Sequence, residues 1–195
     1  MAVDEDWIAL ASRQPLGPLF VVTERFDPSC GERWRAHVAW SGLMQLTEVV
    51  SLDPMLCPTV VHERRDDDWA HVVHEHFMLD YFTDLDWLLR RCGGAAGRNL
   101  LGVFRNPPTR PQRPAGPHAF AFEGYDLVDV TGGASVLTNC SGFDRAFARS
   151  ELTAHGLLPT LERAVEVQRA LLELYPGESH SDCHVWALFR ALSPA

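Results

Sequence analysis

Three side chains that can bind a metal or do nucleophilic chemistry stand close together in "ESHSDCHVWALFRAL", residues 178–192. They are His180, Cys183 and His184, and imidazole and thiolate groups are the ligands that Zn²⁺ prefers. A structural zinc site needs four such ligands, and this segment supplies three. The apolar residues after Cys183 alternate as in a strand, which would place Cys183 and His184 on opposite faces. The sequence therefore predicts that this segment is structural and binds no stoichiometric zinc.

A second histidine group occurs in "HVVHEHF", which contains His71, His74 and His76. In a helix His71 and His74 would share a face, whereas in a strand His74 and His76 would do so. Either pair could hold a metal together with a carboxylate such as Asp80. The motif H-E-x-x-H is absent, so the zincin mechanism is not indicated in its usual form. These three histidines are the candidate metal ligands, and a polar, half-exposed element is the alternative. No cofactor is predicted.

A candidate nucleophile lies in "SVLTNCSGFD", where Asn139 and Cys140 end a predicted strand before a turn of small residues. Rigid elements often hold catalytic groups at such junctions while the loop exposes them. Cys140 could pair with His155, His180 or His184 as a thiolate and imidazole. The candidate catalytic set is Cys140, Asn139 and His184. The alternative is a buried Cys140 beside a polar turn.

Three carboxylates fall along "FEGYDLVDV": Glu123, Asp126 and Asp129. Paired carboxylates can act as acid and base when their environments separate their pKa values. In an acidic protein, three acids on one strand are more typical of a solvent-facing surface, and that is the prediction. The G-x-S-x-G, G-x-G-x-x-G and Walker A patterns are absent, and so is lysine, which excludes a Schiff-base nucleophile.

Composition indicates a soluble globular protein of one domain, residues 1–195. The formal net charge is −9, which argues against binding to nucleic acid and favours a basic protein partner. All 17 basic residues are arginine, a bias typical of a GC-rich bacterial genome.

The start, "MAVDEDWIALASRQPLG", has acids where a signal peptide needs basic residues, and no run of 18 apolar residues occurs. No membrane association is predicted. The five cysteines are widely spaced and odd in number, which favours free thiols in a reducing cytoplasm. They are Cys30, Cys57, Cys92, Cys140 and Cys183.

The pattern of apolar residues, turn residues and caps predicts a mixed set of elements without strict βαβ alternation. The predicted strands are 19–26, 99–105, 119–130 with a kink at Gly124, and 134–140 as its hairpin partner. The predicted helices are 30–41, 83–93 and 159–175. Segments 43–56, 71–82 and 183–192 fit either a strand or a helix, and the proline-rich 106–118 is a surface loop. The fold class expected is α+β, a single domain with a largely antiparallel sheet and packed helices.

The helix 159–175 is expected to bury Leu161, Val165 and Leu172 along one face. For function, the acidic charge and the lack of catalytic fingerprints favour a protein that binds a protein partner, as an immunity-type or regulatory inhibitor does. The alternative is a small cytoplasmic enzyme that uses a Cys140/His pair or a histidine-based metal site. The sequence does not predict the partner, a substrate or the oligomeric state.

Overall fold

The structure is a computed structural model that describes part of the chain. The described residues are 16–17, 52, 67, 70, 72–75, 79–82, 87, 90, 99–111, 119–130, 134–137, 143 and 145–192. The predicted strand 19–26, the predicted helix 30–41 and all of 43–56 except Leu52 lie outside them. Within the described residues, no helix is long and apolar enough to cross a membrane.

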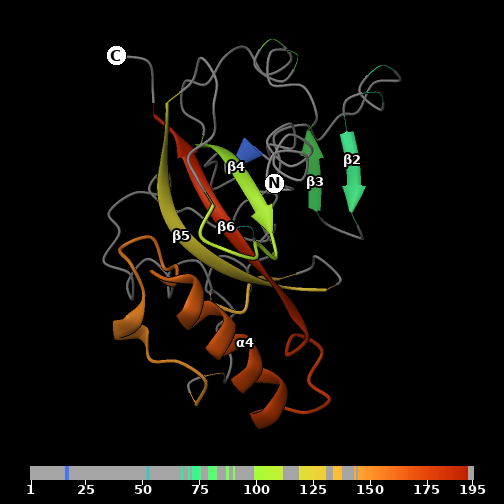
Figure 1. The fold of residues 1–195 in the computed structure, drawn as a ribbon. Helices are drawn as coiled ribbons and strands as arrows, with labels where there is room; N and C mark the ends of the chain where they lie inside the picture. The colour runs from blue at the N-terminus through green and yellow to red at the C-terminus, as the bar shows by residue number, and fades with distance from the viewer. Residues whose placement is uncertain are drawn as a thin grey trace, which may run out of the picture.

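An antiparallel sheet with the strand order β1-β4-β6-β5 forms the main body of the described chain (Figure 1). The strands are β1 (Leu16–Gly17), β4 (Asn99–Arg105), β5 (Phe120–Asp129) and β6 (Cys183–Ala191). The helix α4 (Leu161–Leu174) packs against β5 and β6. This arrangement confirms the α+β prediction, including the antiparallel sheet.

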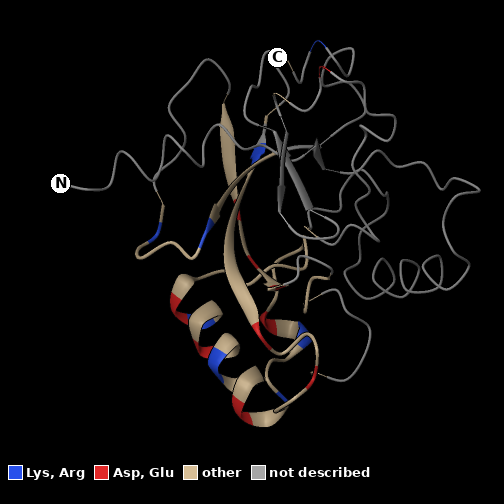
Figure 2. Cartoon of the chain, turned by 90° about the vertical axis from the view of Figure 1, so that its right-hand side faces the viewer, with Lys and Arg blue, Asp and Glu red and all other residues tan. Residues whose placement is uncertain are grey.

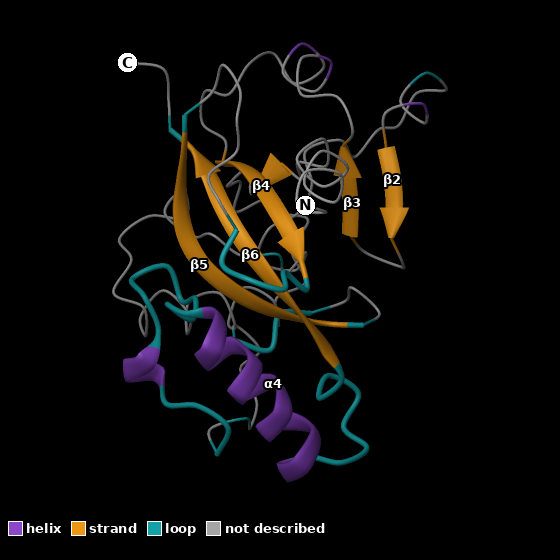
Figure 3. Cartoon of the chain, in the orientation of Figure 1, coloured by secondary structure: helices purple, strands orange, loops and turns teal. Residues whose placement is uncertain are grey.

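A separate two-stranded hairpin pairs β2 (Val72–Glu75) with β3 (Leu79–Phe82). The sequence of segment 71–82 fitted either a strand or a helix, and its described residues form strands. In the predicted helix 83–93, Trp87 and Arg90 are described, and both are helical. Of the predicted hairpin return over 134–140, residues 134–137 are described, and they form a bridge between Ser135 and Val128 followed by a turn rather than a strand. The loop that begins at Asn106 is confirmed over its described part, 106–111 (Figure 3).

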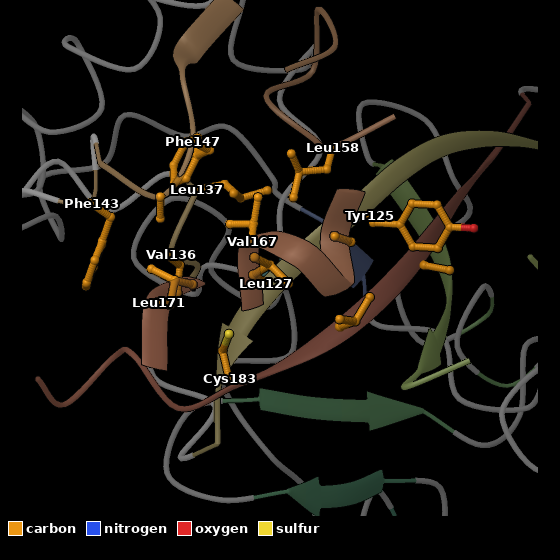
Figure 4. Packing of buried hydrophobic residues seen from close by; sticks show 14 of the residues in the cluster. Tyr125, Leu127, Val136, Leu137, Phe143, Phe147, Leu158, Val167, Leu171 and Cys183 are labelled. Carbon is orange, nitrogen blue, oxygen red and sulfur yellow. The ribbon is translucent and has the colours of Figure 1, made fainter. Parts of the chain in front are cut away.

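β6 is a strand with alternating faces, as its sequence suggested. Cys183, Val185 and Ala187 belong to the cluster that includes the buried side chains of α4, whereas Trp186 and Leu188 belong to a second cluster. Figure 4 shows Cys183 beside the side chains of the first cluster. Both faces of the sheet are therefore buried around β6, and Cys183 and His184 point in opposite directions.

α4 begins and ends close to its predicted bounds, but its buried face differs from the prediction. The Thr160 side chain caps the helix by accepting a hydrogen bond from the Arg163 backbone N–H at 3.2 Å. The buried residues are Ala164, Val167 and Leu171. Leu161 and Val165 are only partly buried at the edge of that cluster, and Leu172 is 49% exposed. The prediction that Leu172 is a core residue was wrong.

The predicted kink at Gly124 is confirmed as a register irregularity in β5 between Phe122 and Gly124. Gly124 has a φ of +144°, and a Cβ there would lie 2.7 Å from the Leu157 Cβ and 2.9 Å from the Leu158 carbonyl oxygen. A glycine is needed because the chain at 157–158 pairs directly with β5. Tyr125 N–H donates to the Leu158 carbonyl at 2.8 Å, and Leu158 N–H donates back at 2.9 Å.

Candidate functional site

The sheet face that points away from α4 carries a buried carboxylate bound by two basic side chains. Arg190 continues the β6 row of Trp186 and Leu188, and its Nε lies 2.8 Å from Glu123 Oε1. His155 Nε2 lies 3.0 Å from the other oxygen, Oε2. The Glu123 side chain is 8% exposed, and those of His155 and Arg190 are partly buried. Both carboxylate oxygens are therefore engaged within the chain.

The loop 153–158 positions His155 against Glu123. Thr153 organises this loop, because its Oγ1 accepts hydrogen bonds from the backbone N–H groups of His155 and Leu157, both at 3.3 Å. Upstream, Arg163 of α4 binds the Glu151 carboxylate and holds the chain that leads into the loop. The register irregularity in β5, the loop 153–158 and α4 therefore together position His155.

Burial by itself raises the pKa of the Glu123 carboxyl, but the hydrogen bond from His155 and the charge of Arg190 outweigh it, so that the pKa lies below its ordinary value of 4.5. A carboxyl whose pKa is lowered on folding stabilises the protein above its unfolded pKa. That stabilisation is lost as the pH falls through the folded pKa.

We expect Glu123→Gln to lower the free energy of unfolding at neutral pH, with the difference from the parent shrinking as the pH falls below 4.5. Denaturant unfolding of both proteins over a pH series measures this difference. Glu178→Gln, at an exposed glutamate in the turn after α4, serves as the control. A Glu123→Gln deficit that stays constant down to acid pH would contradict the lowered pKa.

Asp126, on the same face of the sheet, is fully buried and joins segments that are far apart in sequence. Its Oδ1 accepts hydrogen bonds from the Leu127 N–H at 2.8 Å and from the Ser135 hydroxyl. Its Oδ2 accepts from the Leu52 N–H at 3.0 Å, across 74 residues of chain. A buried carboxylate with three donors is well satisfied, so Asp126 holds Leu52 against the second apolar cluster.

Asp129 lies in the same alternation row of β5 as Leu127, on the α4 side, and it binds the turn between α4 and β6. Its Oδ2 lies 2.9 Å from His180 Nδ1, and the Asp129 side chain is fully buried. His180 therefore fastens the turn that leads into β6. The prediction that Glu123, Asp126 and Asp129 face solvent was wrong, because all three engage partners inside the fold.

His184 binds Asn106, the residue that follows β4. Asn106 has a φ of +47°, and its side-chain Oδ1 accepts a hydrogen bond from the Val185 N–H at 3.0 Å. The amide nitrogen Nδ2 consequently faces His184 Nδ1, at 3.0 Å. Because Nδ2 is a donor, Nδ1 accepts, and the neutral ring carries its proton on Nε2. Asn106 was not identified from the sequence, although its position before Pro107 marked the end of the strand.

His180, Cys183 and His184, the candidate zinc ligands of residues 178–192, therefore lie in three different environments. His180 binds Asp129, Cys183 packs under α4, and His184 binds Asn106 on the opposite face. Within the described residues, no three histidine, cysteine or acidic side chains gather as metal ligands. The geometry supports a structural role for this segment, and its zinc content stays a prediction.

Burial raises the pKa of the Cys183 thiol to about 12, with further contributions from the charges of Asp182, Asp126 and Asp129. At neutral pH the thiol is therefore protonated and a poor nucleophile. We expect iodoacetamide to leave Cys183 unmodified in the native protein and to alkylate it after denaturation. Peptide mass mapping distinguishes this cysteine from the other four. Alkylation of native Cys183 at the rate of the denatured chain would contradict its burial.

Of the remaining candidate residues, the structure describes only His74. His74 lies in β2, where its register partner is Asp80. His71, His76, Asn139 and Cys140 lie outside the described residues. The proposed pairing of Cys140 with His184 and the histidine-based metal site therefore stay predictions.

Comparisons of this chain with protein-family models, with curated proteins and with solved structures find no match.

Proposed function

We propose that this chain acts by binding a basic protein partner, as an immunity-type or regulatory inhibitor would. The observation that carries the proposal is that the buried carboxylates hold the fold together, whereas other acidic side chains are exposed on the surface. Glu123, Asp126 and Asp129, whose burial suits acid–base chemistry, are engaged in contacts that hold the fold together. The net charge is −9, and exposed glutamates lie on the surface of α4.

An excess of surface acid attracts a basic partner and disfavours acidic ones, so it acts on the association rate and on specificity. We place this interaction in the cytoplasm of a bacterium. This is consistent with Cys183 being a free thiol, since unpaired cysteines are usual in proteins of a reducing compartment.

The test is capture from an extract of the source organism at low ionic strength, with the full chain as bait. An unrelated protein of similar size and net charge is the matched control, since it removes proteins that bind any acidic surface. The captured protein is then purified, and its association rate with the chain is measured at low and at physiological ionic strength.

We expect a basic partner whose association slows by about tenfold or more as salt rises, because salt screens exposed charges over about 8 Å at physiological strength. Repeated capture of nothing beyond the control would overturn the proposal. So would a partner whose association rate does not depend on salt.

A further inference from the structure

The Tyr125 hydroxyl is buried without a hydrogen-bond partner. Tyr125 is 1% exposed, and no donor or acceptor in the described part of the chain reaches its hydroxyl oxygen. Figure 4 shows the hydroxyl at the far end of the ring, pointing away from Leu127 and Val167. A buried hydroxyl without a partner costs free energy, because it has lost its hydrogen bonds to water. Phenylalanine would fill the same place without that cost, so the hydroxyl does not serve the stability of the fold.

A second aromatic ring and an arginine lie beside this phenol. The rings of Phe122 and Tyr125 meet edge to face, with their centres 5.1 Å apart. The guanidinium carbon of Arg110 lies 5.1 Å from the centre of the Phe122 ring. Arg110 is exposed on the loop after β4, and Phe122 is partly buried. A guanidinium stacked on a ring directs its N–H groups sideways, where an oxyanion can accept from two of them.

The charges around Tyr125 indicate which oxyanion fits. Burial raises the pKa of the Tyr125 phenol, the charge of Arg110 lowers it and that of Glu162 raises it, so that the pKa lies above its ordinary value of 10.0. At neutral pH the phenol is therefore a neutral hydrogen-bond donor. Glu162 is the first of the acidic residues that Figure 2 shows along α4, and its charge disfavours an anion with two negative charges. A single carboxylate suits these surroundings better than a phosphate.

We propose that Tyr125 and Arg110 bind the carboxylate of a small apolar acid, whose apolar part packs on Phe122. The Tyr125 hydroxyl donates to the carboxylate, and the Arg110 guanidinium donates to it from the exposed side. The ligand enters beside the loop 106–111, where the Arg110 side chain turns outward to admit it. Binding then supplies the hydrogen bond that the fold leaves unmade. This site goes beyond the proposed function and does not depend on it.

The first experiment tests whether the hydroxyl lacks a partner in the free protein. We expect Tyr125→Phe to raise the melting temperature of the full chain by about 2 °C or more, because it removes an unpaired buried hydroxyl. Tyr175→Phe is the matched control, since the Tyr175 hydroxyl accepts a hydrogen bond from the Arg145 backbone N–H at 3.1 Å. That substitution is expected to leave the melting temperature unchanged or to lower it. If Tyr125→Phe melts at or below the parent, the hydroxyl has a partner in the free protein, such as a water molecule, and the inference is overturned.

The second experiment measures ligand binding by calorimetry at neutral pH, with benzoate as the probe. Benzamide is the neutral counterpart of benzoate, and inorganic phosphate is an oxyanion without an apolar part. We expect the parent to bind benzoate and to bind neither of the other two. Tyr125→Phe and Arg110→Gln are each expected to weaken benzoate binding about tenfold or more. Arg169→Gln, at an exposed arginine of α4, is the matched control and is expected to bind as the parent does.

The binding results decide the inference in either direction. A parent that does not bind benzoate, or that binds benzamide or phosphate as tightly, overturns the carboxylate site. Benzoate binding that is unchanged by Tyr125→Phe and Arg110→Gln overturns it as well. None of these results bears on the proposed function, which the capture of a basic protein tests separately.

Discussion

Leu171→Ala is expected to lower the free energy of unfolding by about 2–5 kcal/mol. Leu171 is fully buried in the cluster between α4 and the sheet, which also contains Val167 and Cys183. The loss combines the transfer energy of the removed atoms with the cavity that they leave. Chemical denaturation monitored by tryptophan fluorescence measures the change.

The neighbouring residue provides the control, since Leu172→Ala removes the same atoms from a half-exposed position. Its expected cost is about 0.5 kcal/mol or less. Equal costs at the two positions would mean that α4 is rotated about its axis relative to the face described above.

Gly124→Ala is expected to destabilise the protein by about 2–5 kcal/mol, because it combines overpacking with backbone strain. The added Cβ would lie 2.7 Å from the Leu157 Cβ, and the φ of +144° is one that alanine rarely adopts. The loop 153–158 would have to move off β5. We therefore also expect the acid-dependent loss of stability assigned to Glu123 to weaken, since His155 leaves its place.

Gly177 separates backbone strain from crowding. It has a φ of +86°, but nothing lies within 4 Å of a Cβ built there. Gly177→Ala is expected to lower the free energy of unfolding by about 1–2 kcal/mol, because only backbone strain contributes at this position. If Gly124→Ala costs no more than Gly177→Ala, the close approach of Leu157 to β5 is not a constraint on the fold.

Local patterns predicted several elements of the second half of the chain, although not the turn at 136–137, where a strand was expected. The run of β-forming residues at 99–105 is β4, and the alternation after Cys183 is β6. Pro176 and Gly177 follow the end of α4, and Gly124 marks the irregularity in β5. Each of these features depends on neighbours in sequence, which is why the sequence reveals them.

The buried face of α4 could not be predicted in the same way. The helix has apolar residues around much of its circumference, so both the row with Leu172 and the row with Leu171 have helical spacing. Which row is buried depends on the angle at which the helix meets the sheet. That angle is fixed partly by Gln168, whose amide donates to the Cys183 carbonyl at 2.6 Å.

The burial of the strand carboxylates also depends on distant residues. Asp126 receives a hydrogen bond from Leu52, and Glu123 binds Arg190, which lies 67 residues later in the chain. The alternation of side chains along β5 indicates only which of these acids point to the same face of the sheet. It does not reveal that a second apolar layer, with Leu52 and Leu157, covers the face.

The strand order has a consequence for synthesis on the ribosome. β6 lies between β4 and β5 in the sheet, yet it is the last of the three to be translated. Until residues 183–191 emerge, β4 and β5 have no common neighbour, and their apolar side chains are exposed to other nascent chains. The sheet therefore closes in one late step, and a transcript cut short before this strand yields a product that chaperones and proteases recognise as unfinished.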